Sequence, residues 1–114
     1  MPRPHRHRNV SFQVINDHLE MHVVFPKQPS RDYVHRCSRD VFREVAYTIE
    51  DYAAGGTTLD QIVQAIDAPY TQVNVALGFM KERGCVEVHH RRIFPASDIV
   101  YEDAMIEFMH LADH

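Results

Sequence analysis

Near its N-terminus the chain alternates apolar and polar residues on both sides of an Asn-Asp pair. With Asn16 and Asp17 in a two-residue turn, the apolar residues of the two arms face one another. The facing pairs are Val14 with Leu19, Phe12 with Met21 and Val10 with Val23. A slip of one residue would move this apolar side into solvent, so the register is well specified. The pattern predicts a β-hairpin over residues 10–25 whose apolar side covers another part of the chain.

Downstream of the hairpin, the spacing of apolar residues changes to about 3.6, which is typical of amphipathic helices. Residues 26–37 carry two prolines and little periodicity, so we interpret them as a connector. An apolar stripe at helical spacing then follows Ser38, a residue type that caps helix N-termini. It predicts a helix over residues 39–53, which two glycines end.

A pair of short helices is predicted over residues 58–83. Thr58 and Gln61 have the spacing of a capping box at the start of the first helix. The sequence Asp-Ala-Pro then interrupts the apolar pattern, and a second helix is expected from Tyr70 until Gly84 stops it. We therefore expect two helices joined by a tight turn.

Two short strands and a last helix complete the predicted elements. Residues 85–95 contain two strand-like segments joined by His-His-Arg, which indicates a basic hairpin. Residues 98–112 place acidic side chains on one narrow strip and apolar side chains over most of the remaining circumference. This apolar surface exceeds what one side of a small core needs, so either the N-terminal hairpin or a second chain covers the excess.

Composition and charge narrow the class of protein. A chain of 114 residues suffices for one domain, expected over residues 10–114 after a disordered basic tail at 1–9. We expect no membrane span and no secretory signal, and neither cysteine has metal-site spacing; a cytoplasmic protein with reduced thiols is predicted. The net charge of −4 argues against a general nucleic-acid binder, but residues 69–96 are locally positive.

The central part of the chain resembles the winged helix-turn-helix family. The apolar anchors that carry the resemblance are Ile62, Ile66, Ala68, Val73, Ala76, Leu77 and Met80, followed by Gly84 and Val86. The resemblance covers residues 39–96, about half of the chain. Asp67 stands where the family usually has glycine, and Pro69 where it usually has a hydroxyl cap. The resemblance implies an α+β fold: a winged helix-turn-helix with an added N-terminal β-hairpin and a C-terminal helix.

The same resemblance implies binding to double-stranded DNA, as a dimeric transcriptional regulator. The second helix of the pair would enter the major groove, where Asn and Gln can pair with adenine. The basic hairpin would hold phosphates or enter a minor groove. The residues expected at DNA are Tyr70, Thr71, Gln72 and Asn74 with Val75 beside them, then Lys81, His89, His90, Arg91 and Arg92.

A homodimer is expected through the C-terminal helix, as in many winged-helix regulators. The expected interface residues are Tyr101, Met105, Phe108 and Met109. The basic tail either extends to DNA as an arm or remains a solvated terminus. The alternative function is a winged-helix module that docks another protein without binding DNA, which the acidic net charge favours.

Catalytic and metal-binding chemistry is not expected. His18 and His22 fall on one face of a strand but lie about 13 Å apart, too far to share an ion. The Gly55-Gly56 segment lacks the lysine and the preceding strand of a phosphate-binding loop. No Cys/His or Ser/His pairing has motif support. We therefore expect a protein that is not an enzyme and uses no cofactor or metal.

Overall fold

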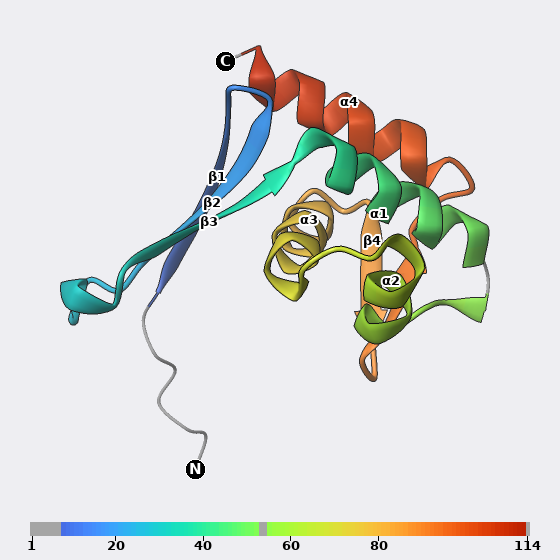
Figure 1. The fold of residues 1–114 in the computed structure, drawn as a ribbon, viewed down its shortest axis with the longest axis horizontal. Coiled ribbons are helices and arrows are strands. Elements are labelled where there is room, and N and C mark those ends of the chain that lie inside the picture. Colours follow the sequence, from blue (N-terminus) through green and yellow to red (C-terminus); the bar gives the residue numbers. More distant parts are fainter. Residues whose placement is uncertain (1–7, 53–54, 114) are drawn as a thin grey trace.

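The computed structural model describes residues 8–52 and 55–113, arranged as two antiparallel sheets and four α-helices (Figure 1). The first sheet has strands β1 (Asn9–Ile15), β2 (His18–Val24) and β3 (Tyr33–Ser38), with a 3-10 helix η1 (Pro29–Arg31) before β3. Helices α1 (Arg39–Tyr52), α2 (Leu59–Ile66) and α3 (Tyr70–Glu82) follow, then strands β4 (Val86–His89) and β5 (Arg92–Pro95), then helix α4 (Val100–Ala112). The fold is mixed α+β.

The N-terminal hairpin has the register predicted from the sequence. Val14 faces Leu19 and Phe12 faces Met21. The turn residues Asn16 and Asp17 have φ angles of 51° and 66°. These values match the left-handed conformation that a two-residue turn between twisted strands requires.

The predicted connector over residues 26–37 is wrong in its second half. Residues 33–37 belong to β3, which pairs antiparallel with β2 and makes the hairpin a three-stranded sheet. Cross-strand partners share a face, so the apolar inner face consists of three rows. The rows are Val10–Val23–Tyr33, Phe12–Met21–His35 and Val14–Leu19–Cys37. The inward positions of β3 include His35 and Tyr33, which are polar or partly polar. The alternation of apolar and polar residues typical of a strand is therefore not evident in the sequence.

On the outer face of the sheet, Glu20 is only 7% exposed although it carries a charge. Arg36, its cross-strand partner, donates from Nε to Glu20 Oε2 at 2.8 Å, and His22 Nε2 lies 2.9 Å from Oε1. The hydrogen bond from Arg36, with a smaller contribution from His22, holds the pKa of Glu20 below its ordinary value despite the opposing effect of burial. The carboxylate therefore ties β2 to β3.

Four phenylalanines connect the sheet to three helices in one core. The ring centroid of Phe12 on β1 lies 5.4 Å from that of Phe79 on α3. The centroid of Phe79 lies 5.8 Å from that of Phe42 on α1. Phe42 in turn lies 5.0 Å from Phe108 on α4. Such aromatic pairs contribute about 0.5–1.5 kcal/mol each beyond area burial. Phe108 is fully buried here, so its predicted place in a dimer interface is wrong.

The element boundaries differ slightly from the predictions. Ser38 caps α1 as expected, because its Oγ accepts a hydrogen bond from the Val41 amide at 3.2 Å. Helix α4 begins two residues later than predicted, after a turn in which the Ile99 amide donates to Ser97 Oγ at 3.2 Å. Asn9, placed in the tail by sequence, already belongs to β1. Residue 53 and tail residues 1–7 lie outside the described residues.

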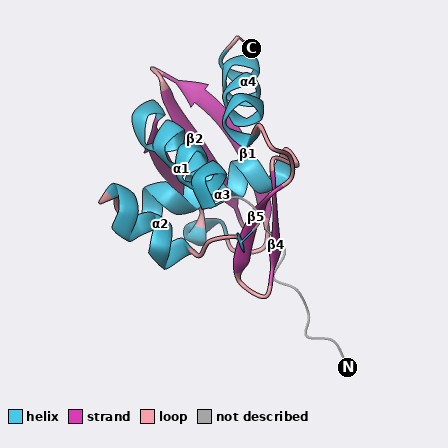
Figure 2. Cartoon of the chain, turned by 90° about the vertical axis from the view of Figure 1, so that its right-hand side faces the viewer, coloured by secondary structure: helices cyan, strands magenta, loops and turns pink. Residues whose placement is uncertain are grey.

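The arrangement places α2 and the β4–β5 hairpin on the side of the molecule away from α4 (Figure 1). Helix α3 lies against β2 and β3, and α4 lies beside β1, while α1 leads away from the end of β3 (Figures 1 and 2). The η1 end of the sheet extends past the helices (Figure 1). In the part of the chain that the structure describes, every helix falls short of the length and apolar character that a membrane span needs.

Candidate nucleic-acid interface

The turn between α2 and α3 follows from local side-chain chemistry. At the start of α2, Thr58 Oγ1 accepts from the Gln61 amide at 3.2 Å, and Gln61 Oε1 accepts from the Thr58 amide at 3.0 Å. This is the predicted capping box. Asp67 ends α2 in the left-handed conformation with a φ of 51°, and Pro69 precedes α3 without a side-chain cap. Pro69 is extended, with φ −61° and ψ 143°, and proline's fixed φ is compatible with this conformation.

In the first turn of α3, some of the residues predicted to contact DNA are exposed and others are buried. Tyr70, Thr71 and Asn74 are exposed, as is Lys81 further along the helix. Gln72 is half-buried, and its Oε1 accepts a hydrogen bond from the Ser38 amide at 3.0 Å. It therefore joins α3 to the end of β3 instead of facing outward.

Val75 was also expected to face outward, and this expectation is wrong. The side chain is fully buried in the core. Helix α3 packs against β3 as well as against α1 and α2. Strand β3 therefore covers a side of the helix that would be open to solvent in a simple helix pair.

Tyr70 is half-exposed, but its hydroxyl donates to the Asp60 carboxylate on α2. This hydrogen bond is the main reason that the pKa of Tyr70 is raised. It also places a negative charge beside the first turn of α3, where it opposes the approach of a phosphate.

The sheet limits how much of α3 a large partner can reach. A Cβ atom added at Gly78, in the middle of α3, would lie 3.5 Å from Phe12 Cζ and 3.8 Å from Met21 Sδ. The inner face of the sheet therefore touches α3 at its midpoint. Access for a duplex is restricted to the first turn and to the end near Lys81.

The β4–β5 hairpin presents four exposed basic or titratable side chains, His89, His90, Arg91 and Arg92. The turn residues His90 and Arg91 have φ angles of 51° and 65°. Arg92 is partly committed to the fold, because its Nε donates to the Gly55 carbonyl at 3.2 Å. Backbone hydrogen bonds between Thr57 and Ile93 in both directions, at 2.9 and 2.7 Å, fasten β5 to the segment before α2.

The surface of α4 differs from the predicted dimer interface. Tyr101 is half-buried: its hydroxyl accepts from Arg43 Nε at 3.3 Å and its ring lies 4.7 Å from that of Tyr47 on α1. Met105 is half-buried against the core. Met109 remains 40% exposed, and Ile106, which was not among the expected interface residues, is 64% exposed.

Sequence reasoning also missed a groove between the inner face of the sheet and α3. Its position depends on β3, which was not predicted, and on the approach of Phe12 to Gly78. The available signal was Gly78 itself, since a glycine inside a helical pattern often has a packing or functional reason.

Among residues 8–52 and 55–113, no group of three or more His, Cys, Asp or Glu side chains is placed to share a metal ion. Comparison of the chain with protein-family models, with curated proteins and with solved structures finds no match.

Proposed function

We propose that the protein binds double-stranded DNA with the first turn of α3 and the β4–β5 turn. The observation that carries the proposal is the conformation of His90 and Arg91, both left-handed at an exposed tip. Asn-Gly is the favoured pair for such a turn, and an ordinary L residue in this conformation costs about 1–2 kcal/mol. A contact between this cationic tip and an anionic partner would explain why such residues stand in the turn, and this supports the proposal.

The order of elements supports the proposal. Helix α1, the α2–α3 pair and the β4–β5 hairpin follow one another as in a winged helix-turn-helix. The Thr57–Ile93 hydrogen bonds hold the hairpin against the start of α2. Helix α2 and the hairpin lie on the side of the molecule away from α4 (Figure 1).

The proposed contacts divide into two kinds. Thr71 and Asn74 face base edges, since an amide can pair with adenine and a Thr methyl can touch the methyl group of thymine. Arg91 and Lys81 face phosphates, which position the protein without reading sequence. With so few cations, we expect a shallow dependence of affinity on salt and modest affinity per subunit.

A titration of a fluorescently labelled random-sequence duplex at low salt, followed by anisotropy, tests the proposal. Arg91→Ala should weaken binding and reduce the salt slope by about 1. Arg31→Ala is the matched control, because it removes the same side chain from η1, far from the proposed interface (Figure 1). Equal affinities of the two variants, or no anisotropy change with wild type, would contradict the proposal.

Asp60→Asn tests the charge beside α3 in the same assay. The substitution removes the carboxylate that accepts from Tyr70 but keeps an acceptor oxygen. We expect a two- to fivefold gain in duplex affinity, the size of an exposed charge–charge effect. An unchanged affinity would remove the first turn of α3 from the interface.

We also propose that two chains associate through α4, with Ile106 and Met109 at the contact. A dimer would present two copies of α3 to a two-fold DNA site. Ile106→Glu should then convert a dimer to a monomer in gel filtration with light scattering. The alternative function, docking of a different protein without DNA binding, is favoured by the same exposed residues and predicts a wild-type monomer with no duplex binding.

A further inference from the structure

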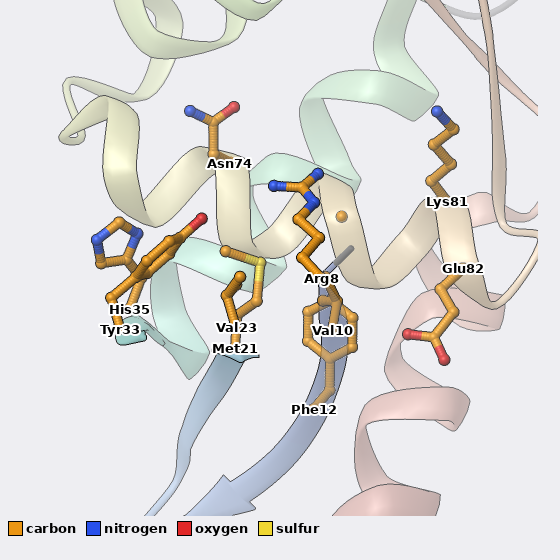
Figure 3. Close-up of a pocket in the computed structure, with 11 residues that line it drawn as sticks. Arg8, Val10, Phe12, Met21, Val23, Tyr33, His35, Asn74, Lys81 and Glu82 are labelled. Carbon is orange, nitrogen blue, oxygen red and sulfur yellow. The ribbon is translucent and has the colours of Figure 1, made fainter. Parts of the chain in front are cut away.

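A groove of 790 Å³ lies between the inner face of the sheet and α3, beside their contact at Gly78 (Figure 3). The row Val14–Leu19–Cys37 packs into the core, whereas the other two rows of the inner face extend over α3. The sheet contributes Val10, Phe12, Met21, Val23, Tyr33 and His35, and α3 contributes Asn74, Gly78, Lys81 and Glu82. Arg8, just before β1, also lines the groove.

Gly78 gives the α3 wall of the groove a point without a side chain. Phe12 and Met21 approach to ordinary contact distance from the place a Cβ would occupy, so a longer side chain at position 78 would extend against these two residues. Both apolar side chains remain only half-buried. Phe12 and Met21 thus form an apolar floor of the groove that is partly open to solvent. Such a floor is typical of a site that buries an apolar part of a ligand.

The charges around the groove favour an anion. Arg8 and Lys81 are exposed cations from opposite walls, with Glu82 as the acidic lining residue (Figure 3). The amide of Asn74 adds hydrogen-bonding groups at the rim. The volume lies within the roughly 300–1,000 Å³ typical of small-molecule sites. A molecule with an apolar body and one negative charge complements both floor and rim.

We propose that this groove binds a small amphiphilic carboxylate. Its apolar part lies against Phe12 and Met21, and its carboxylate lies near Arg8 and Lys81. Asn74 and Lys81 also belong to the proposed DNA surface, so the ligand and the duplex exclude one another. This exclusion rests on the proposed function, whereas the binding site itself does not.

The site is tested with two probes of nearly equal size, 4-phenylbutyrate and 4-phenylbutan-1-ol, titrated into ¹⁵N-labelled protein. Saturable shifts should centre on the Gly78 amide and the Asn74 side chain. The alcohol should bind two- to fivefold more weakly than the acid, because it loses an exposed ion pair. Lys81→Gln should reduce the difference in affinity between the acid and the alcohol, since only Arg8 then remains as a cation at the groove, while Lys27→Gln, which removes a cation outside the groove, should not.

Gly78→Met places an apolar side chain beside Phe12 and Met21, where the apolar part of the probe would lie, and should abolish binding of both probes. A thermal unfolding curve shows whether this variant is folded, and Lys81→Gln decides the charge contribution in either case. Shifts that fail to saturate at Gly78, shifts centred on α4, or equal affinities of acid and alcohol would overturn the proposal.

The exclusion is tested by adding 4-phenylbutyrate to the duplex titration. Saturating acid should weaken duplex binding by wild type and leave binding by Gly78→Met unchanged. Unchanged duplex affinity at saturating acid overturns the exclusion. If wild type binds no duplex, the proposed function fails, and the shift mapping alone still decides whether the groove binds the carboxylate.

Discussion

Replacing Gly78 with alanine should stabilise the protein. Within a helix, glycine costs about 0.5–1 kcal/mol relative to alanine. The added methyl group meets Phe12 at 3.5 Å and Met21 at 3.8 Å, which are ordinary contact distances, so it adds packing without a clash. We expect the free energy of unfolding to rise by about 1 kcal/mol and the melting temperature by about 4 °C. Circular dichroism during heating and during urea titration measures both.

Gly84→Ala is the matched control for this substitution. Among the described residues no heavy atom lies within 4 Å of the added Cβ, but Gly84 has a φ of +74°. The left-handed conformation costs an L residue about 1–2 kcal/mol, so the same chemical change should here lower the stability. A Gly78→Ala protein that melts below wild type, or a common direction for both variants, would refute the reasoning.

The outcome bears on why Gly78 is present. If alanine is the more stable residue, glycine at this position is explained by the width of the groove and not by the stability of α3. The methyl group would then narrow the groove where Phe12 and Met21 approach the helix. We accordingly expect Gly78→Ala to weaken binding of 4-phenylbutyrate even as it raises the melting temperature.

Three further predictions concern other parts of the chain. The pKa of Glu20 is lowered in the folded state, so the ionised carboxylate stabilises the fold at pH values above its ordinary pKa of 4.5, and this stabilisation is lost as the pH falls through the folded pKa. Glu20→Gln should therefore be less stable than wild type at pH 7, and urea titrations should show this difference shrinking toward pH 3. Burial raises the pKa of the Cys37 thiol to about 12 and that of Cys85 to about 11, so both should react slowly with a thiol reagent at pH 8 and rapidly in denaturant; two fast equivalents from native protein would contradict this burial. Replacing His90-Arg91 with Asn-Gly should raise the free energy of unfolding by about 1 kcal/mol while weakening duplex binding, and a loss of stability would show that the left-handed turn is not strained.

The sequence alone predicted features that depend on residues close together in the chain. The hairpin register follows from the alternation around Asn16 and Asp17, because a shifted register would expose every apolar residue of one face. The capping box follows from Thr58 and Gln61, three residues apart. The β4–β5 hairpin was predicted from two short strand-like segments on either side of a basic turn.

Only the tertiary structure decided which faces meet. Strand β3 was missed because it completes its pattern with His35 and Tyr33, whose inward direction depends on pairing with β2. Gln72 is of a residue type usually found at the surface, yet its side-chain oxygen accepts a hydrogen bond from a backbone amide 34 positions earlier. Phe108 is one of many apolar residues around α4, and it lies in the core, with its ring beside that of Phe42, because of how α4 packs on α1. Burial and groove shape arise from contacts between distant segments, and local patterns do not specify these because several packings would satisfy the same apolar stripe.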